Sequence, residues 1–106
     1  MKFRGGMGEL MRQASRLQRK VERRKEELKD EPVEATAGND RVKAVVNGNG
    51  DLLRIEIDPA LLEQEGLALV QDLVVAAVNA ALTKQKQLVE TEVEKVTGGL
   101  KLPGTL

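Results

Sequence analysis

The first third of the chain carries its apolar residues at helical spacing. From Gly8 to about Asp30 they recur at intervals of three and four, the heptad pattern of a seam with apolar residues near positions a and d. The seam consists of Met7, Leu10, Ala14, Leu17, Val21 and Leu28, with Arg24 interrupting it. Pro32 ends the pattern, because the residue before a proline disfavours helical backbone angles. We therefore predict a helix over residues 8–31, preceded by a flexible arm at residues 1–7.

The middle of the chain changes to a period of two. Three runs alternate apolar with polar residues, and the turn signals Gly38-Asn39-Asp40 and Gly48-Asn49-Gly50 join them. The second turn precedes a strand instead of a helix, which indicates a hairpin turn and not a phosphate-binding loop. The apolar members are Val33, Ala35, Ala37, Val42, Ala44, Val46, Leu53, Ile55 and Ile57. We predict a three-stranded antiparallel meander over residues 33–57, with one apolar face.

Two helices are predicted over residues 59–97. Asp58-Pro59 is a helix start, because aspartate favours the N-cap and proline the first helical position. The short helix ends at Gly66, and a long one runs from there to the C-terminal signal Thr97-Gly98-Gly99. Residues 98–106 are expected to form an irregular tail. The whole chain of 106 residues is expected to be one α+β domain.

The long helix predicts an oligomer. Its 30 or so residues span roughly 45 Å, and the first half, residues 67–82, is apolar around most of its circumference. A three-stranded sheet can cover one side, so a second copy of the chain is the simplest cover for the other. Within this half, Asn79 either bonds to its symmetry mate or faces water. The expected dimer interface comprises Leu73, Val74, Ala77, Val78 and Ala81.

The composition excludes several classes of function. With no cysteine and no histidine, the chain has no disulfides, thiolate metal sites or Ser-His-Asp triads. The acidic residues that could form a catalytic or cation site are assigned structural roles; they are Glu56, Asp58, Glu63 and Glu65. The N-terminus lacks the apolar core of a signal peptide, and the longest uncharged apolar run, residues 73–83, is too short to span a bilayer. We expect a soluble cytoplasmic protein with no enzymatic activity, metal, cofactor, small-molecule substrate or membrane partner.

Charge is segregated along the chain although the net charge is zero. Residues 1–30 hold ten basic and five acidic side chains, a surplus of five positive charges that the remaining residues cancel. Arg12, Arg16, Arg19 and Arg23 share one face of the first predicted helix, and Lys20 adds to the run. Arginine grips phosphate with a planar fork of donors, which favours a surface that follows a nucleic-acid backbone. The alternative is a solvated face whose cations pair with Glu22, Glu26 and Glu27.

The only aromatic residue is Phe3, so the chain has no platform on which unpaired bases could stack. This favours double-stranded DNA as the nucleic-acid partner.

Four stretches, in this order and spacing, resemble the YbaB/EbfC family over nearly the whole chain. They are GGMGELMRQASRLQRKVE, RVKAVVNGNGDLLRIEIDPALLE, LVQDLVVAAVNAALTKQKQLVE and VTGGLKLPG. The resemblance implies an intertwined α+β homodimer whose helical ends project like the arms of tweezers. It further implies cytoplasmic DNA binding at the nucleoid, in chromosome organisation or gene regulation, with no cofactor and no known catalysis. The alternative is a protein–protein adaptor in DNA repair or replication, with little DNA binding of its own.

Overall fold

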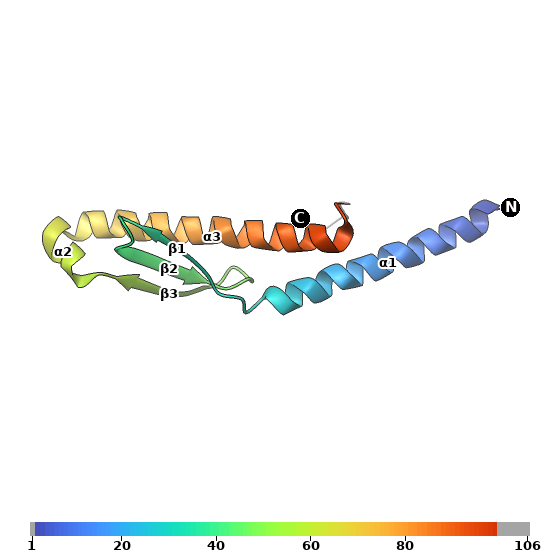
Figure 1. The fold of residues 1–106 in the computed structure, drawn as a ribbon, viewed down its shortest axis with the longest axis horizontal. Helices are drawn as coiled ribbons and strands as arrows, with labels where there is room; N and C mark the ends of the chain where they lie inside the picture. The colour runs from blue at the N-terminus through green and yellow to red at the C-terminus, as the bar shows by residue number, and fades with distance from the viewer. Residues whose placement is uncertain (1, 100–106) are drawn as a thin grey trace.

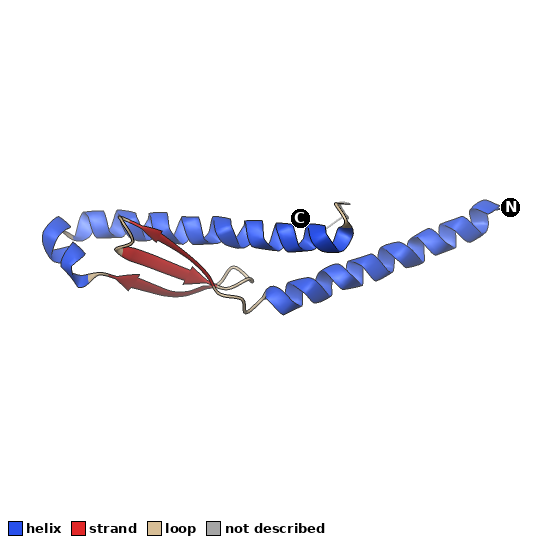
Figure 2. Ribbon diagram, viewed as in Figure 1, coloured by secondary structure: helices blue, strands red, loops and turns tan. Residues whose placement is uncertain are grey.

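The computed structural model describes the backbone of residues 2–99 and the side chains of residues 6–99. The described chain is elongated, 76 × 18 × 16 Å, with a small sheet at one end and a helix projecting from the other (Figure 1). The elements in chain order are α1 (Lys2–Leu28), β1 (Val33–Ala37), β2 (Val42–Val46), β3 (Leu52–Ile57), α2 (Pro59–Glu65) and α3 (Leu67–Thr97). The predicted succession of helix, meander, short helix and long helix is confirmed (Figure 2).

The strands form an antiparallel meander in the order β1-β2-β3. Val33 lies opposite Val46 at one end of the first pair, and Val42 lies opposite Ile57 in the second. The second pair contains an irregularity, because Val45 pairs with Arg54 while Val46 pairs with Leu52. An extra residue in one strand bends that strand and increases its twist, so β3 curves away from an ideal ladder.

The core lies between α3 and one face of the sheet. α3 packs on β1 and β2, whereas β3 lies farther from it (Figure 1). The buried cluster comprises Val33, Val42, Ala44, Val46, Leu61, Val70, Ala77 and Ala81. Ala77 and Ala81 are 0% exposed within the single chain, so they have no surface to offer a second copy. Their assignment to a dimer interface is therefore wrong, because small side chains allow α3 to sit close to its own sheet.

The first helix differs from the prediction at both ends. It begins at Lys2, so the expected flexible arm over residues 1–7 is wrong for residues 2–7. Glycine costs about 1 kcal/mol relative to alanine inside a helix but keeps its N–H group, so Gly5 and Gly6 weaken the helix without breaking it. At the other end the helix stops at Leu28, and the next two residues form a turn before Pro32.

The ends of the later helices follow the prediction. Asp58 caps α2, accepting a 3.0 Å hydrogen bond from the Ala60 backbone N–H, and a proline occupies the first turn. Gly98 ends α3 in the left-handed conformation, with φ of 65°. Of the predicted tail at residues 98–106, the part from residue 100 onward lies outside the described residues.

The β2–β3 turn joins the sheet to both long helices. The backbone N–H of Asn49 donates to the Lys29 carbonyl at 3.2 Å, and Gln85 Nε2 donates to the Gly48 carbonyl at 2.7 Å. A Cβ at Gly48 would lie 1.8 Å from the carbonyl oxygen of Leu28, so only glycine permits this approach. The NGNG stretch is thus a hairpin turn, as predicted, and it also fixes where α1 leaves the body.

Only the C-terminal half of α1 packs against the rest of the chain. α1 runs antiparallel to α3, and its N-terminal half projects beyond the end of α3 (Figure 1). Val21 and Leu28 are 0% and 5% exposed, whereas Met7 and Leu10 are 61% and 62% exposed. We call residues 6–20 the arm. Apart from Gly8 and Leu17, which are half-buried, all of its residues are exposed, so a large ligand could reach most of its surface.

Candidate nucleic-acid interface

All five predicted DNA-contacting residues lie on exposed positions of α1. At 100° per residue, the four arginines fall within about 60° of one another, about half a turn away from the apolar seam. They extend along about 16 Å of helix, from the arm to the level of α3. We call Arg12, Arg16, Arg19 and Arg23 the basic face. Lys20 lies beside it. The fold therefore leaves the basic face open, because the seam and not this face packs on α3.

Two residues of the basic face are ion-paired to an acid at the tip of the arm. Arg12 Nη2 lies 3.0 Å from Glu9 Oε1, and Arg16 Nη2 lies 3.3 Å from Glu9 Oε2. The side chains are 67% and 55% exposed for the arginines and 48% for the glutamate. Exposed pairs of this kind contribute about 0–1 kcal/mol each, so an anionic ligand can displace Glu9 at little cost.

Three cations of this surface are unpaired. Within the described part of the chain, Arg19, Lys20 and Arg23 make no ion pair and no side-chain hydrogen bond. Arg19 borders a shallow depression of about 290 Å³ on the arm, together with Arg12 and Arg16. Lys20 and Arg23 border a groove of about 380 Å³ where α1 meets α3. Three of the five lining side chains in each depression are cationic, although the groove also includes Glu27. Such open, mainly cationic surfaces suit an anionic polymer better than an enclosed small molecule.

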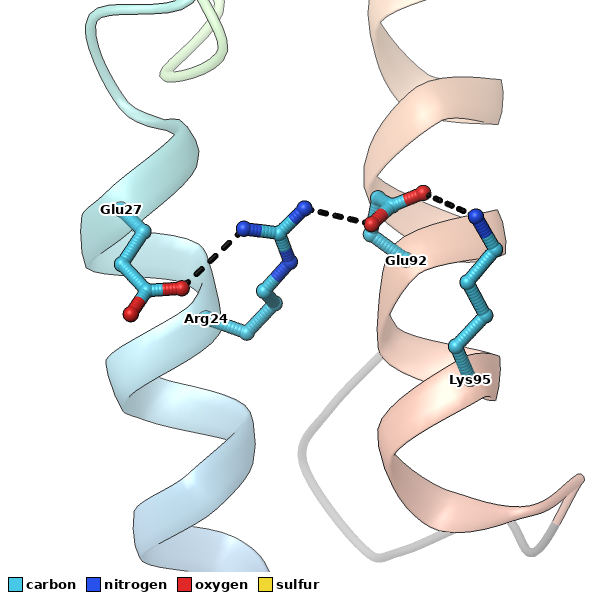
Figure 3. A network of polar contacts seen from close by, with 4 residues as sticks. All are labelled: Arg24, Glu27, Glu92 and Lys95. Carbon is cyan, nitrogen blue, oxygen red and sulfur yellow. Dashed lines mark hydrogen bonds and ion pairs between the residues drawn. The ribbon is translucent and has the colours of Figure 1, made fainter.

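Arg24, which interrupts the apolar seam, points to α3 and not to solvent. It forms an ion pair with Glu92 and donates to Glu27 Oε1 at 3.1 Å (Figure 3). Lys95 Nζ donates to the other oxygen of Glu92 at 2.7 Å. The Glu92 side chain is only 14% exposed. Hydrogen bonds from Lys95 and Arg24 hold the pKa of Glu92 below its ordinary value, and Glu92 raises the pKa of Arg24. The cluster fastens α1 to α3 at the root of the arm.

We expect Glu92→Gln to reduce stability at neutral pH and to flatten the dependence of stability on acid. Because the folded pKa of Glu92 is lowered from 4.5, its contribution is present above that value and is lost as the pH falls through the folded pKa. The difference in urea midpoint between wild type and variant should therefore be larger at pH 7 than at pH 3. Glu94→Gln is the control, because this exposed neighbour has no ion pair among the described side chains. An equal difference at both pH values would show that Glu92 does not act through its charge.

Two of the four acids for which structural roles were predicted, Asp58 and Glu56, make local hydrogen bonds in the structure. Asp58 caps α2, and Arg54 Nε donates to Glu56 Oε2 at 2.8 Å, which lowers the pKa of Glu56. Among the described residues, no three acidic side chains gather in a way that could hold a metal ion. This end of the molecule provides local caps and surface pairs, while the exposed cationic surface lies on α1.

Comparison with known proteins identifies the family of the chain. The family model for the YbaB/EbfC DNA-binding family matches residues 3–100. A nucleoid-associated protein of Thermoanaerobacter sp. (strain X514) is 41% identical over 104 residues, covering 96% of this chain and 94% of its own length. Nucleoid-associated proteins of Acetivibrio thermocellus and Myxococcus xanthus are each 43% identical, over 96% and 89% of this chain and 91% and 90% of their own lengths.

A solved structure shares the fold. The crystal structure of an uncharacterized protein from Helicobacter pylori superimposes with a TM-score of 0.61 at 22% identity, covering 73% of this chain and 89% of that one. Because the family model spans nearly the whole chain and the relatives exceed 40% identity over most of their length, this chain belongs to the YbaB/EbfC DNA-binding family.

Proposed function

We propose that the protein is a homodimer that binds double-stranded DNA mainly through phosphate contacts, in the cytoplasm at the nucleoid. The observation that carries the proposal is the exposed basic face on a projecting helix, beside Lys20, which has no ion pair among the described side chains. Phosphate oxygens accept hydrogen bonds from arginine forks at any base sequence, so such a surface binds duplexes with limited sequence preference. The relatives, which bear the name nucleoid-associated protein, support this role. Chromosome organisation or regulation of genes would follow from such binding.

The proposed dimer covers an apolar region that α3 leaves open beside β3. Leu52 and Ile57 on β3 are 48% and 40% exposed, and Leu67 and Val75 on α3 are 61% and 60% exposed. By length and composition alone, α3 could cross a membrane, yet one side of it packs on the sheet. Only 17% of its most apolar 18-residue window is buried within the chain. A second copy packed along this side would remove the exposed apolar surface from water.

The predicted interface residues that retain some exposure are Leu73, Val74 and Val78. All three already pack against the chain's own core, so their contribution to a dimer would come from their remaining surface. Residues with larger exposure, above all Val75, are better candidates for direct contact with a partner chain. Asn79 is exposed on α3 in the same stretch. A bond across the dimer and contact with water both stay predictions for Asn79.

The binding proposal predicts that Glu9→Gln strengthens DNA binding. The change removes an acid from the tip of the arm and releases Arg12 and Arg16 from their ion pairs. Because exposed pairs contribute about 0–1 kcal/mol each, affinity for a random duplex should rise about two- to fivefold at low salt. A shift assay at several salt concentrations measures this gain, and the slope of log K against log salt should steepen.

Glu63→Gln is the matched control, because this exposed acid lies on α2, at the opposite end of the molecule from the arm. It should change affinity less than Glu9→Gln does. If both variants leave affinity and slope unchanged, the arm does not contact DNA. The adaptor function would then be favoured, with the charged helix docking on another protein.

A further inference from the structure

The apolar seam of α1 continues past the end of α3 without anything to cover it. Val21 and Leu28 are buried where α3 runs alongside, and Leu17 is half-buried. Beyond that point Leu10 and Met7 are more than half exposed, as is Met11 beside them. Ala14 completes this exposed stretch. We call Met7, Leu10, Met11 and Ala14 the tip seam. Its spacing is that of a coiled-coil seam, with positions suited to another helix.

Among the described residues, the side chains that flank the tip seam are uncharged. With Met7 and Ala14 at position a, the flanking e and g positions of the tip hold Gly6, Gln13 and Gln18, together with Met11. The charged residues of the tip that the structure describes lie at outward positions, namely Glu9, Arg12 and Arg16. Nearer the body the same flanking positions carry Lys20, Lys25 and Glu27. Among the described side chains, charge is thus kept away from the seam only where the seam is exposed.

The uncharged flanks of the tip seam indicate which kind of partner helix can pack on it. An acidic partner helix would be attracted by cations at the e and g positions, and the tip offers none among its described side chains. Over the described residues 6–20, a second arm would meet apolar residues and glutamines at the tip, without like charges facing each other. The two basic faces would point outward, on opposite sides of the pair, where salt screens their repulsion. Two tip seams from two copies of the chain can therefore pack against each other.

We propose that the tip seam pairs with the tip seam of an arm from another dimer, and that the pair holds two DNA duplexes on its outer faces. This rests on the proposed function, since the basic face must bind DNA. Each helix is about 10 Å across with its side chains, so the two duplexes would be separated by about 20 Å of protein. Pairing through the tip seam leaves every residue of the basic face free. The arm then joins DNA segments as well as binding one.

Capture of a second duplex tests the proposal. Wild-type protein on a bead-bound random duplex should retain a labelled second duplex, and Met7→Gln with Leu10→Gln should reduce that capture at least about tenfold. Affinity for a single duplex should stay within about twofold of wild type, because both residues lie away from the basic face. Glutamine is a good helix former and both sites are exposed, so circular dichroism should show an intact fold. Thr91→Gln, at an exposed position of α3 away from the arm, is the control and should capture like wild type.

Cysteine cross-linking tests the pairing without DNA, and the chain has no native cysteine to interfere. Under mild oxidation, Ala14→Cys should form a disulfide between arms much faster than Ser15→Cys, and the cross-linked native particle should contain more than two chains. Failure of DNA binding alone would leave this cross-link intact and so would overturn only the proposed function. Equal cross-linking of both variants, or capture unaffected by the double glutamine variant, would overturn arm pairing. Equal cross-linking and unaffected capture are also what we would expect if the tip seam bound an unrelated protein instead of a second arm.

Discussion

Val75→Asp is expected to convert the proposed dimer to a monomer. Val75 is 60% exposed in the single chain, within the mainly apolar first half of α3. If a second copy packs there, the variant buries two unpaired carboxylates, one from each chain, at a cost of at least about 3 kcal/mol. That corresponds to a dimer weakened by more than about a hundredfold, which light scattering coupled to size exclusion would detect as a halved mass.

Two further substitutions separate loss of the interface from loss of the fold. Gln87→Asp places the same charge at an exposed position of α3 on a different side of the helix, and it should remain dimeric. Val74→Asp instead introduces a charge next to the chain's own core and should lower the unfolding midpoint. A dimer of unchanged affinity in Val75→Asp would show that the partner does not cover this side of α3.

Most of the fold could be predicted because its signals are local. The period-two runs around Gly38 and Gly48 determine the meander, since alternate side chains of a strand face opposite sides. The Asp58-Pro59 pair and Gly98 mark helix ends through backbone geometry that few other residues satisfy. Each of these signals involves residues within a few positions of one another, so no knowledge of tertiary contacts was needed.

The errors arose where tertiary contact or a balance of small energies decides. Gly5 and Gly6 suggested a flexible arm, but the penalty of glycine in a helix is small and the helix runs through them. Because α3 is apolar around most of its circumference, the sequence indicated that both sides of the helix are buried. It did not indicate which residues pack on the chain's own sheet and which would contact a partner chain. Ala77 and Ala81 proved to face the chain's own sheet, and Val75, absent from the predicted interface, is the more exposed residue.

The candidate site was predictable as a surface but not in its internal pairing. The arginine spacing on one helix face placed the basic face correctly on exposed positions. The pairing of Arg24 with Glu92, 68 residues later, had no local signal. The only indication of this pair in the sequence was that Arg24 interrupts an apolar seam. A charged residue at such a position needs an oppositely charged partner where the seam packs against another element.

Arg19→Ala combined with Arg23→Ala is expected to cause the largest loss of DNA binding. Both side chains are exposed and without an ion pair in the described structure, so no internal partner must be released before they contact phosphate. The proposed dimer would lose four cations, two from each chain. Each phosphate contact that is removed makes the slope of log K against log salt shallower by about 0.9. Affinity for unrelated random duplexes should fall by a similar factor, at least about tenfold near 0.1 M salt.

The change in slope distinguishes a phosphate-led mechanism from its alternatives. The control is Lys84→Ala with Lys86→Ala, which removes the same charge from exposed positions of α3 and should change the slope less. Folding should survive in the arginine variant, because both residues lie about half a turn from Val21 and Leu28, which pack on α3. Unchanged affinity and slope would exclude the basic face as the DNA-contacting surface. A collapse of affinity on only one sequence would mean that these arginines contact base edges, because phosphate contacts carry no direct sequence information.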